Sequence, residues 1–190
     1  RDEFVLHYQP KVDLRSGKVS GVEALIRWHR PGHGIVPPDR FVDVLEDTGL
    51  ILPVGAWVVR AACEQLAAWD RLGLPPLRMA VNLSGHHIRQ ANFIDRVAEI
   101  LKATGMEPAG LEFELQETSI MGHVQEIIMT LTDLQVHGIH LAIDDFGTGY
   151  SSLSYLKHFP IQRIKIAQEF VTDIHQNADY ATITEAIISM

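Results

Sequence analysis

Two adjacent aspartates, Asp144 and Asp145, end an apolar segment and are followed directly by the glycine-rich turn Phe-Gly-Thr-Gly at residues 146–149. Like charges on neighbouring residues repel, and the partly desolvated end of a strand near a core disfavours the charged form of both carboxyl groups. A bound cation would relieve this repulsion, and the glycines would let the following loop move over a ligand. Taken alone, the segment is equally typical of a strand that ends in a solvated turn.

Side-chain alternation predicts that more polar residues share one face with Asp144. Successive side chains of a strand point to opposite faces. In the segments 18–28, 79–83, 111–117, 140–145 and 163–170, aliphatic residues hold one parity and polar residues the other. Helices must cover the aliphatic face, so the polar residues point away from them. These polar residues are Glu23, Arg27, Asn82, Glu112, Glu114, Asp144 and Lys165.

The order of elements indicates an α/β fold. Two opening strands, 4–13 and 18–28, are joined through a turn at 15–17, and helices and strands then alternate. This order predicts parallel strands with helices outside, in a doubly wound sheet or a barrel. A doubly wound sheet needs two apolar faces, whereas a barrel holds polar residues at the mouth of its strands, so the parity favours a barrel. The predicted helices are 38–48, 57–72, 92 to about 104, 124 to about 138, 150–158 and 178–190.

Composition narrows the class of protein. A chain of 190 residues with 46% hydrophobic and 21% charged residues is an ordinary globular domain or part of a larger one. No apolar run approaches the length of a membrane span, and no signal peptide is visible. Cys63 cannot form an internal disulfide and is expected to be a buried, inert thiol in a reducing cytosol. A net charge of -8 argues against binding to a nucleic acid polymer but permits a small phosphorylated ligand with metal ions.

Oxygen donors on the polar face are the expected metal ligands. Four carboxylates balance two divalent cations, and all-oxygen ligation selects Mg2+ or Mn2+ rather than structural zinc. Two such ions are the usual arrangement for in-line displacement at phosphorus. The expected ligands are Glu23, Asn82, Glu114, Asp144 and Asp145.

Lys165 and Arg27 add positive charge to the same face. Lys165 is placed to orient or deprotonate an attacking water, or to offset charge on phosphoryl oxygens. Arg27 is placed to bind a phosphate through its guanidinium fork. Each residue also has a structural interpretation: a strand-end glutamate is often solvated, Asn82 can cap the next turn, and Lys165 can neutralise a buried carboxylate. Because five residues share one parity, the interpretation that they form a metal site together is favoured over a separate structural role for each.

Seven blocks of the chain, in order, resemble the EAL domain family, bacterial phosphodiesterases of cyclic di-GMP. The block that carries the family signature is Glu-Ala-Leu-Ile-Arg-Trp at 23–28. The match covers nearly all of the chain, which makes it specific. The other blocks are Tyr-Gln-Pro at 8–10, Pro-Asp-Arg-Phe at 38–41, Asn-Leu-Ser at 82–84, Glu-Leu-Gln-Glu at 114–117, Asp-Asp-Phe-Gly-Thr-Gly-Tyr-Ser-Ser-Leu at 144–153 and Lys-Ile at 165–166.

The resemblance implies a modified TIM (β/α)8 barrel with an antiparallel first strand, and hydrolysis of cyclic di-GMP to linear pGpG with Mg2+ or Mn2+, in a two-metal site. It implies that Lys165, Glu23 and Glu117 are catalytic, with Lys165 near the hydrolytic water and Glu117 anchoring the loop after the double aspartate. Gln9 and Arg27 match substrate contacts. The implied metal ligands are Glu23, Asn82, Glu114, Asp144 and Asp145.

The family also implies a homodimer, fusion to sensory or GGDEF domains, and a cytoplasmic location, including the cytoplasmic part of a membrane-anchored protein.

Two departures from the family pattern matter. Ala167 stands where the family usually has aspartate, and by parity it faces the same side as Lys165. The sequence stops at Met190 within a predicted helix, so residues 1–190 are expected to form a partial EAL domain without its last strands and helices. A milder departure is Gln116, where the family often has threonine.

Two other functions remain open at this point. A receptor of the same fold would bind cyclic di-GMP without cutting it, and Ala167 favours that hypothesis. A scaffold or dimerisation module would have lost its ligand, and it predicts erosion of Gln9 and Arg27, which are both present. The complete set of metal-type residues and the intact loop favour the enzyme.

Overall fold

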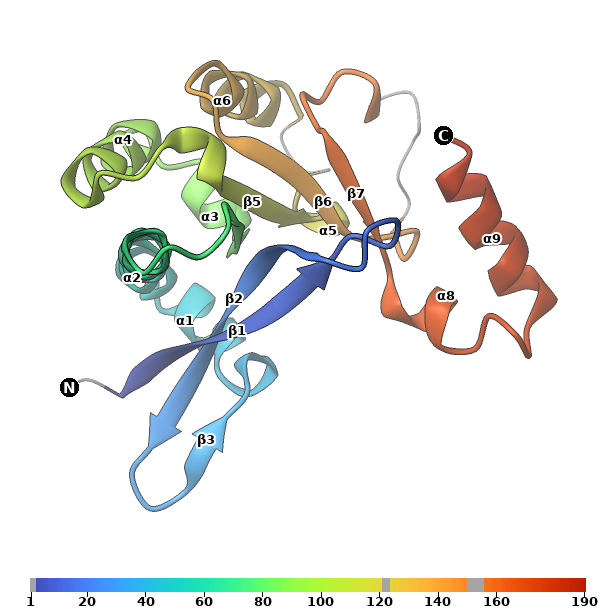
Figure 1. Ribbon diagram of the computed structural model, residues 1–190, viewed down its shortest axis with the longest axis horizontal. Coiled ribbons are helices and arrows are strands. Elements are labelled where there is room, and N and C mark those ends of the chain that lie inside the picture. Colours follow the sequence, from blue (N-terminus) through green and yellow to red (C-terminus); the bar gives the residue numbers. More distant parts are fainter. Residues whose placement is uncertain (1–2, 121–123, 150–155) are drawn as a thin grey trace.

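The computed structural model describes residues 3–120, 124–149 and 156–190 (Figure 1). A seven-stranded sheet runs in the order β1-β2-β4-β5-β6-β7, and β3 pairs with β2 outside this path. The opening pair is antiparallel and the strands from β2 to β7 along the path are parallel. The strands are β1 (Phe4–Val12), β2 (Val19–Arg30), β3 (Gly34–Val36), β4 (Arg78–Leu83), β5 (Leu111–Gln116), β6 (His140–Phe146) and β7 (Arg163–Ile166).

Helices cover the aliphatic face of this sheet, as the parity predicts. The core contains Val81, Phe113 and Ile143 from the strands, with residues of α2, α4 and α6 packed against them (Figure 1). The helices are α1 (Val42–Asp47), α2 (Ile51–Arg71), α3 (Gly85–Ile88), α4 (Phe93–Thr104), α5 (Glu117–Ile120), α6 (Val124–Val136), α8 (Gln168–Thr172) and α9 (Ala178–Ile188), with 3-10 turns η1 (Pro38–Arg40) and η2 (Pro108–Gly110).

The sheet confirms the predicted mixture of strands but is not closed. The antiparallel pair β1-β2 leads into parallel strands, as the sequence predicts. In the described part of the chain, β1 and β7 lie at the two ends of the strand path and do not pair with each other. The architecture of the described residues is therefore a mixed α/β fold with an open sheet, and the expected barrel, which was predicted to lack its last strands here, is not closed.

Several predicted elements differ from those of the structure. The strand expected over 163–170 ends at Ile166, because α8 begins at Gln168 and buries Phe170 against Tyr180 at 5.5 Å between ring centroids. Residues 34–36, for which no strand is predicted above, form β3, whose Ile35 pairs with His29. The helix expected from residue 57 starts at Ile51. The helix predicted over 150–158 falls mainly outside the described residues.

Helix α2 also corrects the expectation that no segment is long and apolar enough to span a membrane. By length and composition alone, this helix of 21 residues passes such a test. Its buried residues Val59, Ala62 and Cys63 belong to the main core, and a core helix passes the same test. Burial raises the pKa of the Cys63 thiol to about 12, in agreement with the inert thiol expected from the sequence.

The early start of α2 depends on two residues that usually disfavour helices. Pro53 lies in the first turn, where its missing N–H has no helical partner to lose. Gly55 leaves room for the ring of His87: a Cβ at this position would lie 1.9 Å from His87 Nε2. That nitrogen lies 3.0 Å from the carbonyl oxygen of Ile51. Burial lowers the pKa of His87 and favours the neutral ring, whose Nε2–H donates this bond.

Gly55→Ala is therefore expected to lower the free energy of unfolding by about 1–3 kcal/mol, measured by urea denaturation. Alanine has a helix propensity advantage of about 1 kcal/mol over glycine, but the steric clash with His87 is larger. In a His87→Ala background the ring is absent, so Gly55→Ala causes no clash. There it is expected to raise the free energy of unfolding above that of His87→Ala alone. A stabilising effect of Gly55→Ala in the parent protein would show that the ring moves aside freely.

Candidate active site

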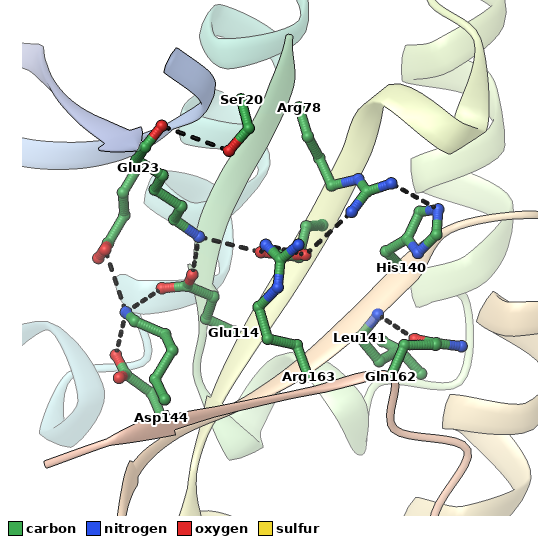
Figure 2. A network of polar contacts seen from close by, with 12 residues as sticks. Ser20, Glu23, Arg78, Glu114, His140, Leu141, Asp144, Gln162 and Arg163 are labelled. Carbon is green, nitrogen blue, oxygen red and sulfur yellow. Dashed lines mark hydrogen bonds and ion pairs between the residues drawn. The ribbon is translucent and has the colours of Figure 1, made fainter. Parts of the chain in front are cut away.

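Three carboxylates from three strands meet on the polar face of the sheet. Glu23 of β2, Glu114 of β5 and Asp144 of β6 each offer one oxygen, and these oxygens lie within 4.8 Å of one another. Figure 2 shows the three side chains converging. The convergence follows from the parallel pairing, which brings the carboxyl ends of neighbouring strands to the same edge.

The ammonium of Lys165, from β7, lies among these carboxylates. Its Nζ donates to Glu23 Oε2 at 3.0 Å, Glu114 Oε2 at 2.5 Å and Asp144 Oδ2 at 2.9 Å. Burial opposes its charge, but hydrogen bonds to Glu114 and Asp144 and the negative charges around it outweigh burial and raise the pKa of Lys165. In this arrangement the Lys165 ammonium donates hydrogen bonds to three carboxylates and offsets their negative charge.

Asn82 of β4 completes the polar cluster by fixing Glu23. Its Nδ2 donates to Glu23 Oε1 at 2.8 Å, which leaves Oε2 for Lys165. Burial tends to raise the pKa of Glu23, but the charge of Lys165 and the hydrogen bond from Asn82 outweigh it and lower that pKa. For Glu114, which is fully buried, burial dominates and raises the pKa although two lysines donate to it. The turn-capping alternative for Asn82 is not seen, because Ser84 caps α3 instead.

The second aspartate of the pair is oriented differently from the first. Asp145 has φ +52°, and among the described residues it is the only non-glycine residue with a positive φ. Its N–H donates to Asp144 Oδ1 at 3.0 Å. Burial and the charge of Asp144 raise the pKa of Asp145. Asp145 is thus outside the three-carboxylate cluster and is more exposed than Asp144.

Glu117, the first residue of α5, contacts the glycine turn after the aspartates. Its Oε2 accepts hydrogen bonds from Gly147 N at 2.7 Å and Gly149 N at 3.3 Å, and the side chain is buried. Gly147 has φ +101°, a conformation that favours glycine, and a Cβ there would lie 2.7 Å from the Phe170 ring. One carboxylate therefore holds the turn at two backbone positions. The rest of the loop, residues 150–155, lies outside the described part.

Two cavities adjoin the carboxylates, and Glu23 and Asp144 line both. One, of 480 Å3, is also lined by Gln9 and Asp145. The other, of 460 Å3, is also lined by Asn82. Gln9 pairs with Glu23 across the antiparallel β1-β2 ladder, so the two side chains share a face. Arg27 is not one of the described residues that line these cavities. Its Nη1 donates instead to the carbonyl oxygen of Ile26 at 2.8 Å.

Comparison with known proteins decides the family, because the family model for the EAL domain matches residues 1–190. The chain belongs to the EAL domain family. It is 40% identical, over its whole length, to the bifunctional diguanylate cyclase/cyclic di-GMP phosphodiesterase MucR of Pseudomonas aeruginosa, of which it covers 28%. It is 39% identical to the cyclic di-GMP phosphodiesterase NbdA of the same organism, with 100% of the chain and 24% of NbdA covered.

Structural similarity gives the same family. The solved MucR phosphodiesterase, a cyclic di-GMP complex, matches this EAL domain with a TM-score of 0.94 and 40% identity, covering 98% of this chain and 76% of that one. The antiparallel opening pair followed by parallel strands is thus the EAL arrangement. This EAL domain spans about a quarter of the length of the curated relatives named above.

The donor set of the EAL domain fits a hard divalent cation. The three clustered carboxylates and the nearby Asn82 and Asp145 offer only oxygen ligands of the type that Mg2+ and Mn2+ prefer. A positive group, the Lys165 ammonium, already lies among the clustered carboxylates. Three carboxylates against the two ammoniums that contact them, those of Lys165 and Lys11, leave negative charge for a cation to neutralise.

Ala167 directly follows the last residue of β7, and its N–H donates to the carbonyl oxygen of Phe146 in β6 at 3.3 Å. Ala167 is buried and precedes the first turn of α8. The cavity of 480 Å3 is lined by its neighbours Ile166 and Gln168. The departure from the family therefore lies at the N-cap of a helix, which has no side-chain cap here.

Lys11 and Glu112 are polar residues of this EAL domain that the sequence interpretation did not place at the site. Lys11 Nζ donates to Glu112 Oε1 at 2.9 Å and also to Glu114 Oε1. The signal for Lys11 is its parity with Gln9 on β1, which becomes informative once the register of β1 against β2 is known. Glu112 shares the parity of Glu114, but it was not counted among the ligands.

Proposed function

We propose that this EAL domain is a metal-dependent phosphodiesterase that hydrolyses cyclic di-GMP to linear pGpG. The observation that carries the proposal is the cluster of Glu23, Glu114 and Asp144 around Lys165, on the face that opens into two cavities. Phosphodiesterases of cyclic di-GMP are among the relatives at about 40% identity. Without this cluster, membership in the family would support binding of cyclic di-GMP but not its hydrolysis.

In this proposal Mg2+ or Mn2+ ions are held by Glu23, Asn82, Glu114, Asp144 and Asp145. When bound, such ions polarise the phosphoryl oxygens and lower the pKa of water to generate a nucleophile. Lys165, as a protonated donor, orients water and offsets negative charge. Asn82 orients Glu23 through its 2.8 Å hydrogen bond, and Glu117 holds the turn that follows the aspartates.

The two cavities suit a ligand that extends to both sides of the carboxylates. A cyclic dinucleotide bound across them would present a phosphate to the cluster, with Gln9 as a contact in the cavity of 480 Å3. Arg27 would have to leave the Ile26 carbonyl oxygen to reach a phosphate, so its role as a substrate contact requires a rotamer change. We also propose that the open sheet is part of a TIM-type barrel. The barrel would belong to a longer, homodimeric signalling protein that carries sensory or GGDEF domains and is cytoplasmic or membrane-anchored.

Hydrolysis and binding can be tested separately. Isothermal titration with cyclic di-GMP in Ca2+ measures binding, and chromatography of the nucleotides after incubation with Mg2+ or Mn2+ measures conversion to pGpG. We expect binding and hydrolysis, with activity lost after chelation by EDTA and restored by added Mn2+. Binding without hydrolysis would support a receptor instead, and neither would support a scaffold.

The receptor is a second candidate because Ala167 stands where the family usually has aspartate. Ala167→Asp is expected to cap α8, raising the free energy of unfolding by about 0.5–2 kcal/mol, and to raise turnover if the missing carboxylate limits catalysis. Ala167→Ser offers the same helix cap without charge, so it is expected to stabilise without raising turnover. Equal turnover in the two variants and the parent would mean that Ala167 has no catalytic consequence and does not favour the receptor.

A further inference from the structure

Lys11 bridges two buried carboxylates of one strand. Its ammonium donates to Glu112 Oε1 at 2.9 Å and to Glu114 Oε1, while Glu112 and Glu114 are each only 1% exposed. Because they are two residues apart in β5, the two carboxylates point to the same face. Two negative charges on one buried face repel, and Lys11 is the cation that lies between them.

Two arginines also contact the carboxylate of Glu112. Arg163 Nη1 donates to Glu112 Oε1 at 2.9 Å, and Arg78 Nη1 lies 3.7 Å from Glu112 Oε2. Arg78 is itself next to His140, with 3.2 Å between Nη2 and Nε2 (Figure 2). Three cations therefore surround the carboxylate of Glu112. Its contacts make it a fixed anchor and leave it outside the three-carboxylate cluster.

Glu114, in contrast, divides its two oxygens between two lysines. Lys11 donates to Oε1, and Lys165 donates to Oε2 at 2.5 Å. Oε2 thereby shares the Lys165 ammonium with Glu23 and Asp144. An ion-pair chain thus runs from Arg163 through Glu112 and Lys11 to Glu114, and it determines which Glu114 oxygen is available to the cluster.

We propose that Lys11 is a positioning residue for the metal centre: anchored on Glu112, it holds Glu114 in the orientation that metal binding needs. The proposal rests on the proposed function, in that Glu114 is taken as a metal ligand. Removing Lys11 has two opposite effects. Loss of a nearby positive charge favours a bound cation, whereas loss of orientation and exposure of the Glu112–Glu114 repulsion disfavour it. The bridging geometry makes the second effect the larger one.

The test compares direct Mn2+ binding by the purified parent protein, Lys11→Met and Lys11→Arg, measured by electron paramagnetic resonance without nucleotide. Lys11→Met keeps an unbranched side chain but no charge, and we expect its Mn2+ affinity to fall by about 10–100-fold, as for other partners that orient metal ligands. Lys11→Arg keeps a cation between the two carboxylates and is expected to restore part of that loss. Lys18→Met, at an exposed position, is the matched control and is expected to bind like the parent.

Unchanged or tighter Mn2+ binding by Lys11→Met would overturn the proposal, because it would show that Lys11 acts only as a repelling charge. If Lys11→Met does not fold, as judged by circular dichroism, Lys11→Gln replaces it as the neutral variant and the same comparison with Lys11→Arg applies. A parent protein that binds Mn2+ but does not hydrolyse cyclic di-GMP contradicts the proposed function and leaves the role of Lys11 testable. A parent that binds no Mn2+ overturns both.

Discussion

Asp144→Asn is expected to reduce hydrolysis of cyclic di-GMP by at least about 100-fold while the protein remains folded. Asp144 supplies one of the three clustered carboxylates, and asparagine of nearly the same shape removes its charge. A hard divalent cation binds a neutral amide oxygen more weakly than a carboxylate. Lys165 keeps Glu23 and Glu114 as partners, so no buried charge is left unpaired and the fold is expected to persist.

The effect of Asp144→Asn is measured as turnover across Mg2+ and Mn2+ titrations, with the melting temperature in EDTA as the check on folding. Asp95→Asn, an exposed aspartate on α4, makes the same chemical change away from the cluster and is expected to keep parental turnover. Parental turnover by Asp144→Asn at saturating Mg2+ would remove Asp144 from the list of metal ligands.

Glu117→Ala is expected to lower turnover by about 10–100-fold although Glu117 is not among the expected metal ligands. The substitution removes the acceptor of the Gly147 and Gly149 N–H groups. The turn that follows Asp144 and Asp145 then loses its fixed position, and a misplacement of about 1 Å can cost about 100-fold in rate. Leaving a backbone donor unsatisfied also costs about 1–3 kcal/mol in stability.

Glu117→Gln is the matched variant for this prediction, because the amide oxygen still accepts from the turn while the charge is lost. We expect it to retain much more activity than Glu117→Ala. Hydrogen exchange of the Gly147 and Gly149 amides reports on the turn directly and is expected to be faster in Glu117→Ala alone. Equal loss of activity in both variants, with unchanged exchange, would mean that the charge of Glu117 matters and its contact with the turn does not.

The clustering of Glu23, Glu114, Asp144 and Lys165 was predictable from the sequence. Strand alternation has a period of two that depends only on backbone geometry, so parity assigns a face wherever the strand is correctly located. The same reasoning failed for the end of the strand expected over 163–170, because residues 168–172 form α8, and the direction of Ala167 stays a prediction. The order of helices and strands was likewise predictable, whereas several element ends depended on tertiary packing.

Sequence reasoning did not predict the positions of residues with long, flexible side chains or an unusual backbone conformation. Arg27 has the predicted parity, but its flexible side chain turns back to the carbonyl oxygen of Ile26. Lys11 was missed because its partners lie on β5, 101 and 103 residues away, and only the completed sheet brings them together. Asp145 departs from strand alternation because its φ of +52° is a backbone state that composition does not reveal.

The left-handed backbone at Asp145 restricts the mutational routes by which this site can lose its chemistry. Asparagine and glycine, each one nucleotide change from an aspartate codon, tolerate a positive φ, so they remove the carboxylate without straining the chain. Valine and alanine are equally close in the genetic code, but both strain the turn, and the β-branched valine does so most. Relatives that have drifted from catalysis to mere binding are therefore expected to carry asparagine or glycine at this position, and their folds are expected to survive the change.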